Sequence, residues 1–416
     1  MKKRLITFLI FLLFIFINIC NAQWVQMSNG IGVWKSVRCF TISGNNIFAG
    51  TSGYGVYFSS DNGSNWSQTS LSDRDMSALT IHGNNIFAGT LGDGVYLSTN
   101  NGTNWSQTSL NDIFIYSIAV LGNYIFAGAH YGVYLSTNNG TNWTQTSLNN
   151  QDVHSLAILG NNIFAGTANL LPGSGNVYLS TNNGANWNQI SLNYKNVYSL
   201  FVNNSNIFAG TDSGVFFSSN NGINWTQTAL NNKSVYSLAI LGNNIFAGSG
   251  INNGVYLSTN NGTSWIQKNQ GFSIISIIPN IESLCILNNY IFAGTAGYCV
   301  WRRIYSEAIG IKKTSELVPK SFSLLQNYPN PFNPSTKIKF DIINPLSRGV
   351  GEARGVWTQM KVFDITGREI TTLVNESLIP GSYEITFDGS NLPGGIYFYR
   401  LEANDFVLTN KMILLK

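Results

Sequence analysis

One four-residue phrase recurs seven times in this 416-residue chain. Ile-Phe-Ala-Gly begins at intervals of 38 to 46 residues, at Ile47, Ile86, Ile125, Ile163, Ile207, Ile245 and Ile291. A unit of about 40 residues cannot bury an apolar face by itself, so neighbouring units must stack, as they do in solenoids and propellers. The repeat therefore limits the chain to a stacked architecture.

Each repeat contains four short strand patterns separated by Asn and Gly. In the repeat that begins at Val235 they are Val-Tyr-Ser-Leu-Ala-Ile, Ile-Phe-Ala-Gly, Gly-Val-Tyr-Leu-Ser-Thr and a polar stretch after Trp265. Asn-Gly pairs favour tight hairpin turns, and no stretch of the repeats has the period of a helix. Seven units of four antiparallel strands predict an all-β chain with a seven-bladed β-propeller over residues 23–305.

The two ends of the repeat region complement each other. The last repeat lacks the Asn-Asn-Gly turn and the tryptophan that open the fourth strand, whereas Gln23-Trp24-Val25-Gln26 resembles Trp143-Thr144-Gln145. We therefore expect the first strand to complete the last blade, which removes free sheet edges. Closure would also make the innermost strands that carry Cys39 and Cys285 neighbours, which leaves a single disulfide between them open.

Residues 1–22 have the pattern of a secretory signal peptide. Met-Lys-Lys-Arg precedes an apolar run from Leu5 to Cys20, and Ala22 supplies the small residue before the expected cleavage at Gln23. The run is short for a membrane span, so we expect no transmembrane segment after signal removal. Acylation at Cys20 is the alternative, but Ile19 occupies the position where a small residue should stand.

The charge content excludes two classes of partner. Only 10% of the residues are charged, against about 25% in ordinary soluble domains. The formal net charge is +4, and Lys2, Lys3 and Arg4 contribute three of those units, so the remaining chain is close to neutral. Without a basic field, neither nucleic-acid binding nor attachment to an acidic membrane is expected.

Cysteine and histidine give no metal-binding pattern. After signal removal Cys39, Cys285 and Cys299 remain, without a CxxC spacing, so we expect neither a zinc site nor a disulfide framework. The histidines are isolated from one another in the sequence, and lone loop histidines are usually solvated. The sequence therefore predicts no metal and no cofactor.

A tryptophan motif marks the turn before the fourth strand of six repeats. In the first repeat it reads Ser60-Asp61-Asn62-Gly63-Ser64-Asn65-Trp66. It resembles the Asp-box, or BNR repeat, of sialidases, sortilin-type receptors, xyloglucanases and photosystem assembly-factor propellers, in which the side chains bond their own backbone. The resemblance extends over residues 24–305 and implies a structural role. The motif residues are Asp61, Trp66, Asn100, Trp105, Asn138, Trp143, Asn182, Trp187, Asn220, Trp225, Asn260 and Trp265.

The repeats differ most at one end of the expected ring. In propellers the loops between blades share a face with the loops between second and third strands, and these loops vary here while the box-side turns barely change. Loops on a rigid scaffold commonly carry function, but loosely packed loops also drift fastest, and both interpretations stay open at this point. The candidate binding residues are Tyr54, Asp73, Arg74, Asp75, Asp93, Phe114, His130, Tyr131, Asp152, His154, Tyr194, Lys195 and Asp212.

The number and placement of acidic residues bear on whether the propeller could be an enzyme. Glycosidases need two carboxyl groups beside the scissile bond, and Glu282 is the only glutamate between Gln23 and Tyr305. Loop aspartates could supply such a pair, yet no two are singled out, and Asp75 and Asp152 occupy comparable positions between blades. We therefore expect no enzyme, with a glycan-degrading hydrolase that uses loop aspartates as the alternative.

A different pattern starts after Tyr305. Residues 306–320 are more charged and are expected to form a linker, and about seven short strands with Pro and Gly turns over residues 321–416 indicate a small immunoglobulin-like β-sandwich. Four segments resemble the type A C-terminal sorting domain of the type IX secretion system of Bacteroidota. They are Asn327 to Thr336, Val362 to Glu369, Leu392 to Tyr397 and Lys411 to Lys416.

This second resemblance implies that residues 321–416 are a sorting signal. It implies passage through the periplasm, recognition of residues 321–416 by the type IX translocon and sorting machinery, and release or attachment at the outer-membrane surface. Removal of the domain by a cut within residues 306–320 belongs to this hypothesis. The segment from Asn344 to Thr358 is longer than the usual hairpin of the family, so strand boundaries there stay open.

These patterns together predict a secreted or cell-surface propeller that acts as a non-catalytic scaffold. Its partner would be an unidentified protein or an extracellular glycan.

Overall fold

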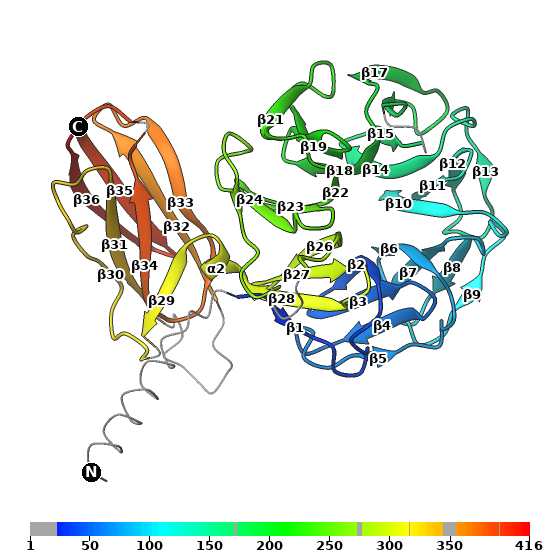
Figure 1. The fold of residues 1–416 in the computed structure, drawn as a ribbon, viewed down its shortest axis with the longest axis horizontal. Helices are drawn as coiled ribbons and strands as arrows, with labels where there is room; N and C mark the ends of the chain where they lie inside the picture. Colours follow the sequence, from blue (N-terminus) through cyan, green and yellow to red (C-terminus); the bar gives the residue numbers. More distant parts are fainter. Residues whose placement is uncertain (1–22, 170–172, 273–276, 316, 344–354, 391) are drawn as a thin grey trace, which may run out of the picture.

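A computed structural model of the protein describes residues 23–169, 173–272, 277–315, 317–343, 355–390 and 392–416. The expected signal peptide, residues 1–22, lies outside them. The chain forms a ring of small sheets with a second β-rich unit beside it (Figure 1), which confirms the predicted all-β class. No helix in the described part of the chain has the length and hydropathy needed to cross a bilayer.

Seven four-stranded antiparallel sheets form the ring, so the predicted seven-bladed propeller is confirmed. In the first six blades the strands follow chain order from the innermost to the outermost (Figure 1). These blades are β2 (Val37–Ser43), β3 (Asn46–Thr51), β4 (Gly55–Ser59) and β5 (Ser67–Gln68); β6 (Met76–His82), β7 (Asn85–Thr90), β8 (Val95–Ser98) and β9 (Ser106–Gln107); β10 (Ile115–Leu121), β11 (Tyr124–Ala129), β12 (Gly132–Ser136) and β13 (Thr144–Gln145); β14 (Val153–Leu159), β15 (Asn162–Thr167), β16 (Asn176–Ser180) and β17 (Asn188–Asn193); β18 (Val197–Asn203), β19 (Asn206–Thr211), β20 (Gly214–Ser218) and β21 (Thr226–Asn231); β22 (Val235–Leu241), β23 (Asn244–Ser249), β24 (Val255–Ser258) and β25 (Ile266–Gln267).

The seventh blade joins the two ends of the ring. It consists of β26 (Ile281–Leu287), β27 (Tyr290–Thr295), β28 (Val300–Ile304) and, as its fourth strand, β1 (Val25–Gln26). Trp24, just before β1, is only 2% exposed. Its indole stacks on Phe272 with ring centroids 5.0 Å apart, and Nε1 donates a hydrogen bond to the Lys268 carbonyl at 2.6 Å. The amino end of the ring is therefore held in the last blade by a buried aromatic side chain.

The phenylalanine of each Ile-Phe-Ala-Gly repeat packs between blades. All seven of these rings are fully buried. In five neighbouring pairs the ring meets the glycine of the next blade's Asp-box turn, so that a Cβ added to Gly102 would lie 2.9 Å from Phe48. The same contact crosses the closure, because a Cβ on Gly63 of the first blade would lie 2.8 Å from Phe292 of the seventh. One repeated contact thus joins five of the seven pairs of neighbouring blades, the closing pair included.

The glycine of Ile-Phe-Ala-Gly allows the inner strand of the next blade to approach closely. A Cβ on Gly128 would lie 2.7 Å from the Val153 carbonyl oxygen, and one on Gly294 would lie 2.5 Å from the Val37 carbonyl oxygen. These glycines have no positive φ, so it is the lack of a side chain rather than backbone freedom that the position requires.

The open disulfide between Cys39 and Cys285 does not form. Their strands, β2 and β26, are neighbours across the closure, yet both cysteines are free. The reason is orientation: Cys39 packs between the first and second blades, whereas Cys285 packs between the seventh and the first. Burial raises the pKa of Cys39 to about 12 and also raises the pKa of Cys285, so neither thiol is reactive.

The expected linker over residues 306–320 is wrong for its first half. α2 (Tyr305–Ala308) is one helical turn, and Tyr305 is buried with its ring 5.8 Å from that of Phe246. β29 (Ile311–Ser315) pairs with β34 (Gly381–Asp388) of the second unit. Ile309, between them, packs against both the last blades and the second core. The apolar residues of this charged stretch gain partners that are distant in sequence, which composition alone does not reveal.

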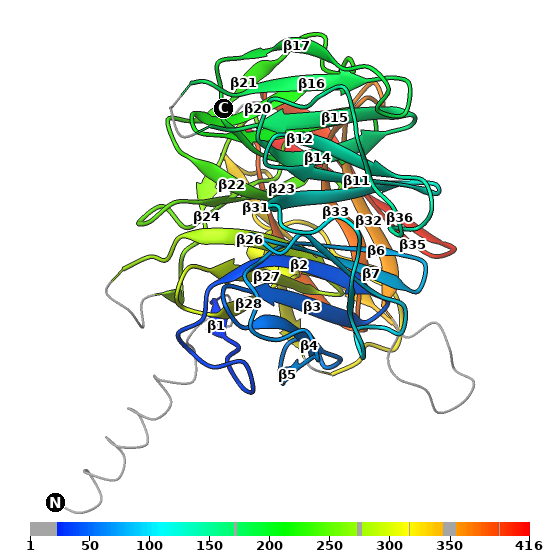
Figure 2. The same cartoon turned by 90° about the vertical axis from the view of Figure 1, so that its right-hand side faces the viewer.

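Two four-stranded antiparallel sheets enclose the second core, as predicted for a β-sandwich. It lies behind the blades in Figure 2. One sheet orders β29, β34, β31 (Ser335–Ile342) and β30 (Ser323–Leu324); the other orders β33 (Glu369–Leu378), β32 (Val356–Asp364), β35 (Gly395–Ala403) and β36 (Phe406–Leu414). Of the segment whose boundaries the sequence left open, residues 344–354 lie outside the described residues and Val356 begins β32.

Replacing Trp24 by alanine should destabilise the ring. Loss of a buried tryptophan typically costs about 3–5 kcal/mol, and here it also removes the anchor of the closing strand. Urea unfolding followed by circular dichroism measures the change. The matched control is Trp34→Ala, because Trp34 is 74% exposed and exposed substitutions change stability by about 0.5 kcal/mol or less. Equal midpoints for the two variants would contradict the role of Trp24.

The close approach at Gly128 gives a second test. Gly128→Ala forces a methyl group against the Val153 backbone, and such overpacking costs about 1–3 kcal/mol. The control is Gly250→Ala, where the nearest atom to the new methyl is the Tyr236 ring at 3.6 Å, an ordinary contact. Thermal unfolding of both variants should show a lower midpoint only for Gly128→Ala. A lower midpoint in the control alone would show that the blades can separate at Gly128 without cost.

Candidate binding face

Two kinds of loop meet at one end of the ring. The Gly55 N–H donates to the Arg74 carbonyl at 3.0 Å and the Leu91 N–H donates to the Asp75 carbonyl at 2.9 Å, which joins the first inter-blade loop to the second-to-third-strand loops on either side. Similar bonds recur around the ring. We define the variable face as residues 52–54, 91–94, 130–131, 168–169, 173–175, 212–213, 250–254 and 296–299 together with residues 34–36, 72–75, 111–114, 150–152, 194–196, 232–234 and 277–280.

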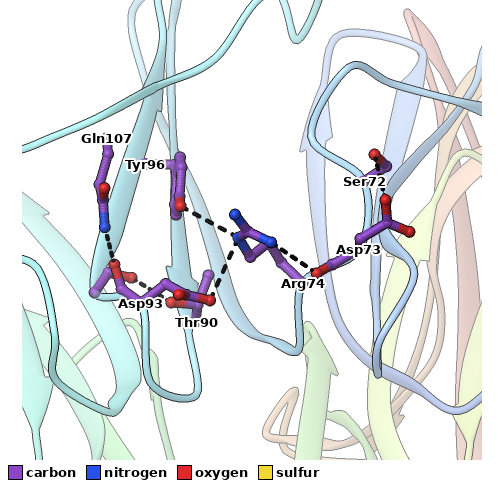
Figure 3. Close-up of polar contacts among 8 residues, drawn as sticks. Ser72, Asp73, Arg74, Thr90, Asp93, Tyr96 and Gln107 are labelled. Atoms are coloured by element: carbon purple, nitrogen blue, oxygen red, sulfur yellow. Dashed lines mark hydrogen bonds and ion pairs between the residues drawn. The ribbon is translucent and has the colours of Figure 1, made fainter.

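Arg74 links two loops of the variable face (Figure 3). Its guanidinium lies 3.4 Å from the Asp93 carboxylate, donates to the Tyr96 hydroxyl at 3.3 Å, and donates to the Asp73 carbonyl at 3.0 Å. Gln107 holds the other side of the second loop by donating to the Asp93 carbonyl at 2.7 Å. The structure therefore brings three predicted residues, Asp73, Arg74 and Asp93, into one polar cluster.

The predicted aspartates Asp75 and Asp152 serve different loops. Asp75 accepts a hydrogen bond from Ser52 Oγ at 2.5 Å. Asp152 lies 2.7 Å from His130 Nδ1 and accepts from the Tyr131 N–H at 3.2 Å. Each carboxylate thus ties its inter-blade loop to the neighbouring loop, and the two aspartates do not share a partner.

Asp212 and Lys195 occupy a third place on the face. Asp212 Oδ2 accepts from the backbone N–H groups of Gly173 and Asn196, both at 3.2 Å. Lys195 donates to Ser213 Oγ at 3.2 Å, and Ser213 donates to Asp212 at 2.8 Å. This aspartate is also engaged in holding loops together.

Exposed aromatic side chains of the propeller are confined to the variable face. Among the described residues of the ring, the aromatic side chains classed as exposed are Trp34, Tyr54, Phe114, Tyr131 and Tyr194. Four of these are candidate residues predicted from the sequence, and Trp34 is not. The available signal was register, because Trp34 is a tryptophan that neither opens a fourth strand nor belongs to an Asp-box.

His154 lies on a strand rather than in the loops of the variable face. It follows Val153 at the start of the innermost strand β14, and its ring stacks on Tyr116 at 4.3 Å.

Asp73 and Asp112 lie on the variable face but adopt left-handed turns, with φ values of 55° and 54°. Asp residues tolerate this conformation well, so a turn role is sufficient to account for both.

The Asp-box residues lie in the turns between the third and fourth strands of the blades. These turns are at the end of the ring opposite the variable face. In the first blade Ser59 Oγ accepts from the Gly63 N–H at 2.9 Å and Asp61 Oδ1 accepts from the Asn65 N–H at 2.9 Å. Although partial desolvation opposes it, hydrogen bonding from Asn65 and Ser59 lowers the pKa of Asp61. Asn100 makes the same backbone contact at 2.8 Å, so the amide replaces the carboxylate in this geometry.

The sandwich matches a known family. Residues 326–415 match the secretion system C-terminal sorting domain. The chain therefore carries a sorting signal for type IX secretion to the cell surface or outer membrane. Among curated proteins no sequence match is found.

Solved structures share the fold at low identity. PorZ, an essential bacterial surface component of the type IX secretion system of Porphyromonas gingivalis, is 14% identical with a TM-score of 0.54, over 92% of this chain and 59% of PorZ. YCF48 bound to D1 peptide is 15% identical with a TM-score of 0.55, over 69% of this chain and 96% of YCF48. The extracellular domain of the putative hybrid two-component system BT4673 of B. thetaiotaomicron is 18% identical with a TM-score of 0.57, over 80% of this chain and 48% of that domain. These similarities establish the fold alone.

Tyr194 offers a test of whether the variable face is under a demand other than stability. Its φ is 57°, and the equivalent residues of other inter-blade loops are Asp73, Asp112 and Asn232. A left-handed backbone costs a bulky residue about 1–2 kcal/mol, whereas Asn tolerates it. Tyr194→Asn should therefore raise the free energy of unfolding by about 1 kcal/mol, measured by urea unfolding. Tyr54→Asn is the control, because Tyr54 has no positive φ; equal or lower stability of Tyr194→Asn would contradict the expectation.

Proposed function

We propose that this secreted propeller is a non-catalytic scaffold that captures an extracellular protein or glycan on its variable face. The observation that carries the proposal is the placement of the exposed aromatic side chains: all five in the described ring lie on this face. Exposed aromatic residues on a rigid surface provide contact area at low entropic cost and are enriched in binding hot spots. Trp34, Phe114 and Tyr131 come from different loops, so a ligand would bridge blades.

The contacts of the loop aspartates favour binding over hydrolysis. A glycoside hydrolase requires two carboxyl groups that face one bond, about 5–9.5 Å apart, with one of them protonated. Asp75, Asp152 and Asp212 each accept hydrogen bonds that join two loops, and Asp93 is paired with Arg74. Carboxylates used in this way act as hydrogen-bond acceptors within the scaffold.

The similar propeller YCF48 was solved with a bound peptide. It supports the use of this fold as a binder of a peptide ligand. The low net charge of the chain favours a ligand that is recognised through aromatic contacts and hydrogen bonds rather than through a strong electrostatic field.

A pair of double variants tests the proposal. The purified chain is incubated with immobilised extracellular glycans and with an outer-membrane fraction, and any ligand identified is then titrated in pure form. Tyr131→Ala with Tyr194→Ala should weaken binding by about tenfold or more, as expected for hot-spot residues. Ile223→Ala with Ile266→Ala, which removes side chains that are 66% and 64% exposed away from the face, should leave binding unchanged.

Two outcomes would contradict the proposal. Equal loss of binding in both double variants would place the ligand elsewhere. New reducing ends in the glycan reactions that disappear in Asp75→Asn or Asp152→Asn would show hydrolysis by loop aspartates instead of passive binding.

A further inference from the structure

Each innermost strand carries one residue that its neighbouring strand does not pair. The first residue of every innermost strand is 0% exposed, and the pairing register shifts immediately after it, between Val37 and Cys39 in the first blade and at the equivalent place in the others. Such bulges turn a side chain away from the regular pleat. The bulged residues are Arg38, Ser77, Tyr116, His154, Tyr198, Tyr236 and Glu282.

These seven residues, which we call the axial cluster, lie around the axis of the ring. The innermost strands are mutual neighbours in a closed circle (Figure 1), and each bulge lies at the end of its strand that adjoins the variable face. All seven residues are half-buried. The axial cluster is therefore the centre of the face on which the exposed aromatic residues form the rim.

Four consecutive blades contribute an arc of aromatic rings to the axial cluster. The Tyr116 and His154 rings are stacked, 4.3 Å apart with an interplanar angle of 6°. Tyr198 follows at 6.5 Å from His154, and Tyr236 lies 5.0 Å from Tyr198. Burial lowers the pKa of His154, and Asp152 opposes this only in part, so the imidazole is neutral at pH 7 and continues the arc as an uncharged ring.

Arg38 and Glu282 complete the cluster on the side opposite the arc. They lie on β2 and β26, which are neighbours across the closure. Among the described residues Arg38 has no hydrogen-bond or ion-pair partner, and Glu282 Oε2 is enclosed without a hydrogen-bond partner. Burial raises the pKa of Glu282, which the charge of Arg38 counteracts in part. Buried polar atoms normally have partners, so a ligand hydroxyl group that reached Glu282 would satisfy an acceptor that the fold leaves unpaired.

Aromatic faces next to unsatisfied polar groups suit a sugar ring. The C–H faces of a pyranose are apolar and pack on aromatic rings, while its hydroxyl groups need donors and acceptors in fixed directions, which a guanidinium and a carboxyl group supply. With one donor group and one acceptor group together, and few charges elsewhere on the chain, the cluster offers nothing that selects a polyanion.

We propose that the axial cluster binds the terminal ring of a neutral glycan, with the Tyr116 to Tyr236 arc as the stacking surface and Arg38 and Glu282 as the hydroxyl-binding groups. This inference rests on the proposed function of the protein as a surface scaffold and names one class of ligand for its central part.

Affinity electrophoresis tests the axial site with the full chain. The protein is run in native gels that contain a β-glucan, a mannan, a xylan or an arabinogalactan, and its retardation gives the apparent affinity. At least one polysaccharide should retard the protein, and Tyr116→Ala and Glu282→Gln should each weaken that binding by about tenfold or more. Ile223→Ala, distant from the axis, is the matched control and should bind as the parent chain does. Circular dichroism checks folding, and Arg38→Gln replaces Tyr116→Ala where that variant unfolds.

The outcomes separate this inference from the proposed function. Retardation that is lost in the Tyr131→Ala, Tyr194→Ala double variant but kept in Tyr116→Ala and Glu282→Gln supports the scaffold and overturns the axial site. Absence of retardation on all four polysaccharides overturns the axial site, while the pull-down of a protein ligand still decides the proposed function. If gels that contain denatured casein retard the protein instead and Glu282→Gln abolishes that effect, the cluster binds polypeptide and the assignment of a glycan is overturned.

Discussion

The contact between a buried phenylalanine and the box glycine of the next blade supports the rest of this structure. Each blade is a small sheet with two apolar faces, so it gains little stability alone and depends on a neighbour on either side. The contact of Gly63 with Phe292 repeats across the closure the contact made within the ring. Ser283 Oγ of the last blade likewise donates to the Val37 carbonyl of the first at 3.2 Å. Closure therefore satisfies the end blades with the same kind of contact that joins four other pairs of neighbouring blades.

This packing divides the molecule into a constant end and a variable end. The box turns are fixed because each one satisfies its own backbone and five of the six also cover a phenylalanine of the preceding blade. The loops at the other end are held by backbone hydrogen bonds that recur around the ring and by side-chain contacts that differ from blade to blade, such as those of Asp75 and Asp212. Aromatic and charged residues can accumulate there without loss of blade packing. The face that carries the candidate ligand contacts is thus the face that the fold leaves free to change.

The sequence predicted what depends on local repetition and missed what depends on distant partners. Blade number, box turns and the variable face follow from the period of the repeats, because every unit reports the same local geometry. The segment around Ile309 was interpreted as a linker because its apolar residues find partners in the last blades and in the second core. The bulged positions were not recognised either: Tyr116 and Tyr236 look like ordinary strand residues until the pairing of both strands is known.

The residue types in the axial cluster bear on whether random sequence drift among the repeats is enough to account for them. The seven positions share one backbone geometry and sit between strongly repeated neighbours, so random drift from a common ancestor would scatter unrelated polar residues among them. Instead the aromatic rings are contiguous, from Tyr116 to Tyr236, and in mutual contact. The only glutamate of residues 23–305, Glu282, lies on the blade next to that of Arg38. Burial of an unpartnered carboxyl oxygen carries a free-energy cost, which the fold does not require at this position, since serine occupies the equivalent place at Ser77. The charge of Arg38 offsets that cost only in part, and a ligand that engages both groups would compensate for the rest.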